Sequence, residues 1–326
     1  MRRRDFIALI GGSAMAWPTK VRAQTSAMPV IGFMNGGGSA EAWRWNAFRQ
    51  GLRATGYVTD QNVHVEFRWA EGHYDRLPEM AADLVRRQVN VIAATGALPA
   101  LAAKAATTVI PIVFETASDP VQLGLVDNLN RPGGNITGVT QLNVEIAPKL
   151  VELLHELVPT AHVMALLVNP AASVLAESQS RAIQSAANKF GLELHFLNAS
   201  SEQDFDAVFA DVVRLRAGGL VISADPVFTK GMERLAALTL RHAVPAIYVY
   251  REFAVAGGLI SYGSDHSESY RLAGIYTGRI LKGERPADLP VQQATKVELY
   301  INLKTAATLN IALPLALSGR ADELIE

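Results

Sequence analysis

The chain of 326 residues contains no cysteine at all. Disulfide bonds, thiolate nucleophiles and thiolate zinc ligands are therefore excluded, and a lipid anchor on an N-terminal cysteine is not expected. Such a chain must fold on its apolar core alone. Hydrophobic residues make up 49% of the sequence, and the length is enough for two domains of ordinary size.

Long hydrophobic runs are also missing. A membrane-spanning helix needs roughly 20 apolar residues, and the N-terminal apolar run, residues 6–17, is well short of that. This run follows Arg2-Arg3-Arg4-Asp5 and leads to Val21-Arg22-Ala23, which is the order of charged region, apolar region and small-residue cleavage site in an export signal.

Residues 1–23 are therefore predicted to be a cleaved signal peptide, with the mature chain starting near Gln24. Arg3-Arg4-x-Phe6 resembles the twin-arginine export signal, which is read by a receptor and anchors nothing. We expect a periplasmic protein without a lipid anchor. A cytoplasmic chain with a basic N-terminus is the alternative.

Basic charge is not in excess, because 30 Lys and Arg stand against 31 Asp and Glu. Residues 1–23 carry a net charge of +4, so the remaining 303 residues carry −5. A mildly acidic chain without a basic cluster is a poor binder of nucleic acids and anionic membranes. No nucleic-acid partner is expected.

Signature motifs of catalysis and cofactor binding are missing too. The chain has no GxxxxGK[ST] and no GxSxG, and in Asn35-Gly36-Gly37-Gly38-Ser39 the third glycine of a dinucleotide loop is replaced by Glu41. The seven histidines include no i, i+4 pair and no HExxH. We therefore expect no cofactor, no metal site and no enzymatic activity. A secreted α/β hydrolase using carboxylates at strand ends remains the alternative.

Short apolar runs alternate with helical patterns, which favours βαβ units and parallel sheets. Two consecutive blocks of this kind predict two doubly wound lobes of α/β class, with right-handed connections. The first block has expected strands at 30–34, 63–69, 89–95, 112–115 and 136–140, and the second at 163–168, 192–197, 220–223, 246–250 and 259–262.

Ligands of such sheets bind beyond the carboxyl ends of the strands. Asp119-Pro120, Asn169-Pro170 and Asp225-Pro226 each follow an expected strand and are typical of a helix N-cap with proline at the first helical position. Three helix N-termini at one cleft would suit an anionic group. The alternative is that each pair is only a cap.

Five further residues are candidate ligand contacts. The glycine-rich turn with Asn35 and Ser39 can bring backbone close to a ligand. Trp43, which lies off the helical stripe of Trp45, Phe48 and Leu52, either covers an apolar ligand or packs at a helix end. Tyr250 offers an aromatic face. Arg251 either clamps a carboxylate or forms an ion pair with Glu252 or another acid.

Several long motifs resemble one large bacterial family, the ABC-transporter substrate-binding proteins related to the tryptophan/tyrosine-type periplasmic binding components. The resemblance runs in order over nearly all of the mature chain. Its clearest motifs are AFRQGL with GY at 47–57, FRWAEG at 67–72, DPV at 119–121, RPGGNITG at 131–138, GGLISYGSD at 257–265, ILKGERPADLPVQ at 280–292 and INLKTA at 301–306.

The resemblance implies a type I periplasmic binding fold, in which two lobes joined by three crossovers close on a solute. Crossovers near Leu142, Tyr262 and Gln292 would give lobe 1 as 28–142 plus 263–292 and lobe 2 as 143–262 plus 293–326. The segment after the third strand, rich in hydroxyl groups in relatives, is here Thr95-Gly96-Ala97-Leu98-Pro99, with a single hydroxyl. Ser118, Asp119 and Asp265 keep the family's polar character.

We therefore predict a monomeric periplasmic receptor that binds a small polar or amphipathic solute, such as an aromatic amino acid or aromatic acid, and delivers it to an ABC permease of the inner membrane. Asp119 and Asp265 would hold a positive or hydroxyl group, and Arg251 a negative one. The full set of predicted ligand contacts is Asn35, Ser39, Trp43, Thr95, Gly96, Ser118, Asp119, Asn169, Asp225, Tyr250, Arg251 and Asp265.

Overall fold

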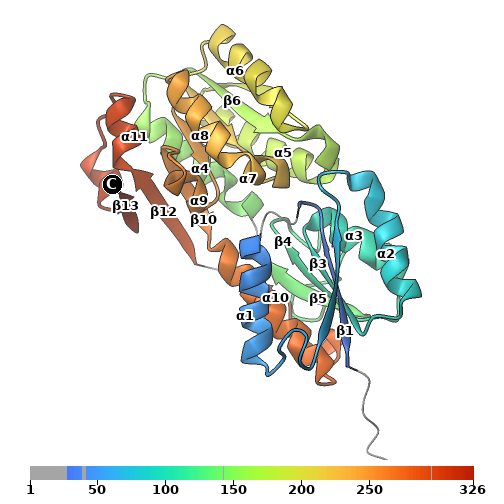
Figure 1. Cartoon of the computed structure of the whole chain (residues 1–326). Helices are drawn as coiled ribbons and strands as arrows, with labels where there is room; N and C mark the ends of the chain where they lie inside the picture. Colours follow the sequence, from blue (N-terminus) through green and yellow to red (C-terminus); the bar gives the residue numbers. More distant parts are fainter. Residues whose placement is uncertain (1–27, 39–41, 142, 295) are drawn as a thin grey trace, which may run out of the picture.

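The described part of the chain forms two α/β lobes, each built on one sheet with helices on both faces (Figure 1). The computed structural model describes residues 28–38, 42–141, 143–294 and 296–326, so the predicted signal peptide lies outside it. Among the described residues, no helix combines the length and apolar character needed to cross a membrane. The predicted class, two doubly wound α/β lobes, is confirmed.

The first sheet has six strands in the order β11-β5-β4-β3-β1-β2, and every neighbouring pair is parallel. Its strands are β1 (Val30–Asn35), β2 (His64–Trp69), β3 (Val91–Thr95), β4 (Ile112–Thr116), β5 (Ile136–Thr140) and β11 (Gln292–Gln293). Its helices are α1 (Ala42–Ala54), α2 (Leu77–Arg86), α3 (Ala97–Ala106) and α10 (His266–Leu281), with short 3-10 turns at Tyr74–Arg76 and Pro286–Asp288.

Alternation of side chains along the strands divides the core of this lobe into two layers. Phe33 and Val113 belong to the layer that packs on α1 and α10. Their neighbours Met34 and Phe114 belong to the layer on α2 and α3. Because both faces are covered, the inner strands β1, β3, β4 and β5 are buried along nearly their whole length, whereas the edge strand β2 alternates and is partly exposed.

The second sheet has seven strands in the order β13-β12-β10-β9-β8-β6-β7. Its strands are β6 (Val163–Val168), β7 (Glu193–Asn198), β8 (Gly219–Ile222), β9 (Ala246–Tyr248), β10 (Ile260–Ser264), β12 (Val297–Asn302) and β13 (Glu323–Ile325). Unlike the other pairs, β12 runs antiparallel to β10. This antiparallel pair was not expected, because no strand was predicted after residue 262.

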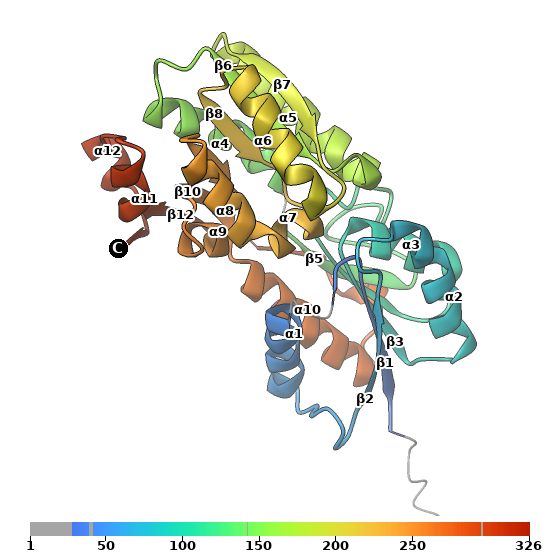
Figure 2. The ribbon, with the colours of Figure 1, turned by 45° about the horizontal axis from the view of Figure 1, so that its top comes forward.

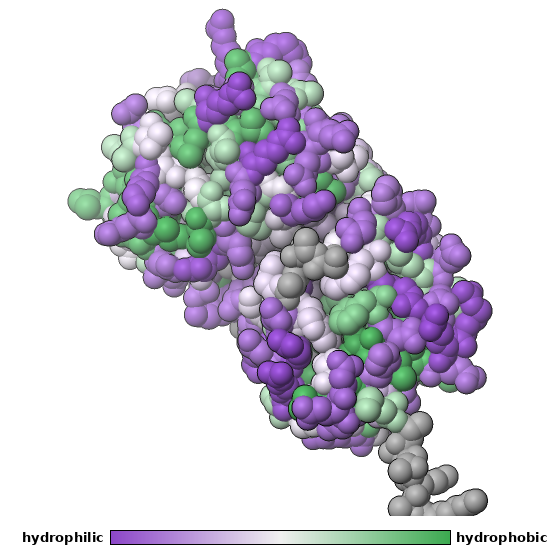
Figure 3. All heavy atoms as spheres, in the orientation of Figure 1, coloured by the Kyte–Doolittle hydropathy of each residue, from purple (hydrophilic) through white to green (hydrophobic). Residues whose placement is uncertain are grey.

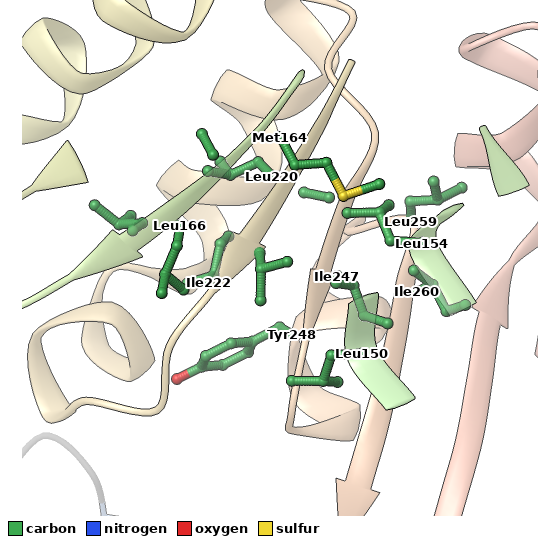
Figure 4. Close-up of a cluster of buried hydrophobic side chains, with 14 of the residues drawn as sticks. Leu150, Leu154, Met164, Leu166, Leu220, Ile222, Ile247, Tyr248, Leu259 and Ile260 are labelled. Atoms are coloured by element: carbon green, nitrogen blue, oxygen red, sulfur yellow. The ribbon is translucent and has the colours of Figure 1, made fainter. Parts of the chain in front are cut away.

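Helices on both faces of the second sheet enclose a continuous core, part of which is drawn in Figure 4. Leu150 and Leu154 of α4 pack there against β8, β9 and β10. The helices are α4 (Asn143–Leu157), α5 (Ser173–Lys189), α6 (Phe205–Arg214), α7 (Pro226–Lys230), α8 (Met232–Arg241), α9 (Arg251–Val255), α11 (Leu303–Thr308) and α12 (Leu315–Ser318), with 3-10 turns at Pro170–Ala172 and Glu202–Asp204.

The chain passes between the two sheets three times, between β5 and α4, between β10 and α10, and between β11 and β12. Two views show α10 leaving the second lobe to lie beside α1 in the first (Figures 1 and 2). β10 continues to Ser264, so the second passage comes slightly later in the chain than the expected 262. On the face in Figure 3, hydrophilic side chains dominate, and apolar patches on the two lobes are separate.

One predicted helix start is wrong. Asp119-Pro120 opens a series of turns and no helix. The Asp119 carboxylate accepts hydrogen bonds from the backbone N–H groups of Val121 and Gln122, as a cap would, but Gly124 follows with a φ of +66°. That left-handed residue ends the helical direction of the chain. By contrast, Asp225 caps α7 as predicted, through Val227 N–H at 2.8 Å.

Candidate functional site

A small cavity of about 60 Å³ lies between the lobes, where the carboxyl ends of both sheets meet. Lobe 1 supplies the ends of β1, β3 and β4 together with α1, and lobe 2 supplies the segments after β8 and β9. The start of α10 completes the wall. The residues that line the cavity are Asn35, Arg44, Thr95, Gly96, Ala97, Glu115, Thr116, Ala117, Ser118, Ala224, Asp225, Pro226, Thr229, Tyr250, His266 and Tyr270.

Lobe 1 brings a buried cation and a buried carboxyl group to this cavity. Arg44 is 3% exposed and its guanidinium lies 5.3 Å from the centre of the Trp43 ring. Burial raises the pKa of Glu115 to about 7, although a hydrogen bond from Gln141 (2.7 Å), the charge of Arg44 and a hydrogen bond with Tyr270 all oppose the rise. Glu115 is thus able to change its charge near neutral pH.

Lobe 2 brings Asp225, whose carboxylate is also buried. Burial raises its pKa to about 6. Three hydrogen bonds act against that rise: the Asn169 amide donates to Oδ1 at 3.1 Å, Val227 N–H donates to the same oxygen, and the Tyr74 hydroxyl donates to Oδ2 at 3.2 Å. Tyr74 belongs to lobe 1, so this last bond joins the two lobes across the cleft.

The side of the cavity toward the crossovers is aromatic. The rings of Tyr250 and His266 stack with centres 4.0 Å apart, and Tyr270 meets His266 edge-on at 5.1 Å. Burial and the charge of Arg44 hold the pKa of His266 well below its usual value, so the imidazole is neutral. Among the buried polar atoms of the lining, Ser118 Oγ and His266 Nδ1 have no hydrogen-bond partner within the described residues. Unsatisfied buried atoms of this kind are suited to a ligand.

Half of the twelve predicted contacts line the cavity. These six residues are Asn35, Thr95, Gly96, Ser118, Asp225 and Tyr250. Asn169 does not line the cavity, but its side-chain amide donates a hydrogen bond to Asp225, which does. The Asn35 amide donates to Thr95 Oγ1 at 2.7 Å, which ties the ends of β1 and β3 together. Ser39 lies outside the described residues.

Four predicted contacts lie elsewhere. Arg251 forms a two-pronged ion pair with Glu323, at 2.8 and 2.9 Å, on the exposed surface, so the ion-pair alternative holds. The Asp119 carboxylate accepts hydrogen bonds from the backbone of its own turn. Trp43 and Asp265 line a separate groove between α1 and α10, although the Trp43 ring also meets His266 at 4.8 Å. Asp265 caps α10 through Glu268 N–H at 3.1 Å.

The predicted ligand contacts did not include Arg44, Glu115, His266 or Tyr270, which also line the cavity. Arg44 lies on the buried stripe of α1 together with Ala47 and Phe48, in the run Trp43-Arg44-Trp45 that follows the glycine-rich turn. An arginine flanked by two tryptophans at a helix start is a usable signal. No sequence signal pointed to Tyr270, because this residue lies at the cavity only as a result of α10 returning to lobe 1.

Two α/β lobes joined by three crossovers, with a buried polar cavity at the facing strand ends, define a bilobal solute-binding protein. The sequence model of the family described as ABC transporter substrate binding protein matches residues 30–325, and the chain belongs to this family. It is a family of substrate-binding proteins, so the alternative of a secreted hydrolase is set aside. Its members bind small solutes, deliver them to ABC permeases and typically work outside the cytoplasm.

Named relatives agree with this assignment. The chain is 26% identical over 271 residues to a tyrosine-binding protein of Clostridioides difficile. The aligned residues cover 81% of this chain and 75% of the relative. It resembles a structure from Streptococcus pneumonia in complex with L-Trp, with a TM-score of 0.80 and 23% identity. A conserved domain protein of Vibrio cholerae gives a TM-score of 0.82 and 24% identity. Both structures cover 91% of this chain and 99% of their own.

Proposed function

We propose that the protein is a periplasmic receptor for a solute of the amino-acid class, carrying both a carboxylate and an ammonium group. The observation that carries this proposal is the charge pattern of the cavity. Arg44 provides a cation from lobe 1, and Asp225 provides an acid from lobe 2. A zwitterion matches both, and only when the lobes are closed.

Each group has a role in this arrangement. The Arg44 guanidinium binds the solute carboxylate, for which its planar donors are well suited, and Ser118 Oγ donates to the same group. Asp225 accepts from the ammonium group. Contacts from both lobes stabilise the closed state relative to the open one, and this difference is the whole mechanism, with no bond made or broken.

Two relatives support the class of ligand. One is named a tyrosine-binding protein, and another was solved in complex with L-Trp. We further infer that residues 1–23 are removed on export and that the mature chain acts as a monomer without a lipid anchor. Mass spectrometry of the exported protein tests the cleavage near Ala23, and light scattering tests the monomer.

The ligand class is tested by thermal unfolding of the mature chain against the common amino acids, their decarboxylated amines and their deaminated acids. A ligand at 100 times its dissociation constant adds about 2.7 kcal/mol of stability. Amino acids should raise the melting temperature, and analogues lacking either charged group should not. If amines or simple acids bind as tightly as the amino acid, the zwitterion proposal is wrong.

A further inference from the structure

The aromatic side of the cavity has one unusual member, the imidazole of His266. Its face lies on the Tyr250 ring at 4.0 Å with the planes only 10° apart. The rings of Trp43 and Tyr270 meet it nearly edge-on, at 4.8 and 5.1 Å. Edge-on contacts of this kind are an arrangement in which aromatic rings attract one another. His266 thus occupies an aromatic slot with three walls.

One nitrogen of the imidazole in that slot forms no hydrogen bond among the described residues. This nitrogen, Nδ1, is buried, and only 6% of the residue is exposed. Burial and Arg44 hold its pKa well below the usual value, so the ring is neutral. It therefore stays in the slot chiefly by shape and stacking, as a bound aromatic ring would.

The space left beside His266 is too small for a second ring. The cavity measures about 60 Å³, whereas an engineered cavity that binds benzene measures roughly 150 Å³. Room of this size suits the ammonium and carboxylate groups of an amino acid with a short side chain. An indole or phenol ring would have to displace the imidazole or keep the lobes apart.

We propose that His266 is a specificity-determining residue that fills the aromatic slot and thereby selects amino acids with compact side chains over aromatic ones. This inference rests on the proposed function and deepens it. It gives this chain a different ligand preference from the relative named a tyrosine-binding protein and the relative solved in complex with L-Trp. Removing the imidazole should open the slot between Tyr250 and Trp43 to a ligand ring.

The test is calorimetric titration of the mature protein with alanine, serine, tyrosine and tryptophan. The unmodified protein should bind the compact pair at least tenfold more tightly than the aromatic pair. His266→Ala should gain at least tenfold for an aromatic ligand, and His266→Gln, which refills most of the slot, should largely reverse that gain. His242→Ala is the matched control, because His242 also stacks on a ring, that of Phe209 at 5.6 Å, but lies outside the cavity.

The outcomes separate the two proposals. If the unmodified protein binds tyrosine or tryptophan as tightly as alanine, the role of His266 is wrong and the amino-acid class stands. A folded His266→Ala protein that gains nothing for aromatic ligands also overturns it. If none of the four amino acids binds, this inference is wrong, and the thermal unfolding test with all common amino acids decides the proposed function. Should His266→Ala not fold, the affinity order of the unmodified protein still decides.

Discussion

Two acids and a guanidinium buried in one small cavity carry a large desolvation cost, which a folded protein accepts only when other contacts offset it. Asp225 has three hydrogen-bond donors, and Glu115 has Gln141 and Tyr270. These donors hold both acids in place before any ligand arrives. Preorganised polar groups of this kind bind a charged solute without having to rearrange.

At the scale of the residue, Arg44 should dominate affinity. Arg44→Ala removes the cation that faces the solute carboxylate, and truncating one partner of a buried charge pair costs about 2–5 kcal/mol. Affinity should therefore fall roughly thirtyfold or more in calorimetry. Arg251→Ala is the control, since Arg251 pairs with Glu323 at the surface. Equal losses in the two variants would contradict the assignment of Arg44.

Glu115 should make the ligand-free protein less stable as the pH rises. Its pKa is raised from 4.5 to about 7 in the folded protein, so between these values the folded state keeps a proton that the unfolded state has lost. The contribution of Glu115 to the free energy of unfolding is therefore largest below pH 4.5. It is lost as the pH rises through 7, by about 3 kcal/mol in total. Denaturant unfolding from pH 4.5 to 8 measures it.

Glu115→Gln is the matched variant for that measurement, because it keeps the shape of the side chain and removes the titration. Exposed acids with lowered pKa, such as Asp83, act in the opposite direction but are common to both proteins. The difference between the two pH profiles isolates Glu115. Parallel profiles would show that this group does not titrate in that range.

At the scale of the element, the pairing of α1 with α10 holds the site together, because α1 carries Arg44 and α10 carries His266. The two helices approach closely at a pair of glycines. A Cβ added at Gly51 would lie 1.9 Å from the Arg271 carbonyl oxygen, and one at Gly274 would lie 2.0 Å from that of Phe48. Only glycine allows this distance between the helices.

Gly274→Ala should push α10 away from α1 and damage both stability and binding. Overpacking of a buried contact typically costs about 1–3 kcal/mol, which thermal unfolding would detect. Ligand affinity should fall as well, since Arg44 and His266 move apart. At Gly319 an added Cβ would come no closer than 3.2 Å to the Leu315 carbonyl oxygen, so Gly319→Ala should have a much smaller effect. Similar losses in both variants would rule out the helix contact as the cause.

Hydrophobic runs and periodicity predicted most elements, because these are local properties of the chain. The strands at Ile136–Thr140 and Val163–Val168 match their expected bounds. The strand-end rule also placed Asp225 at the cavity, and the family resemblance pointed to Thr95 and Ser118. Side-chain direction was beyond the sequence. Arg251 turns to Glu323, a residue 72 positions away whose approach depends on β12 and β13.

At the scale of the whole molecule, the two lobes meet across the cleft without a ligand. Tyr74 of lobe 1 donates a hydrogen bond to Asp225 of lobe 2 at 3.2 Å. A hydrogen bond to a charged group contributes about 1.5–3 kcal/mol, which is enough to shift an open–closed equilibrium by tenfold or more. This contact therefore favours closure before the solute adds its own contacts.

Tyr74→Phe should shift the ligand-free protein toward the open state, because the phenylalanine ring cannot donate to Asp225. Small-angle scattering should show a larger radius of gyration without ligand and an unchanged one at saturation, and affinity should fall roughly tenfold. Tyr276→Phe is the matched control. Its hydroxyl donates to the Pro290 carbonyl oxygen within lobe 1, so its loss lowers stability without affecting closure. An unchanged radius of gyration for Tyr74→Phe would mean that the bond between Tyr74 and Asp225 does not hold the lobes together.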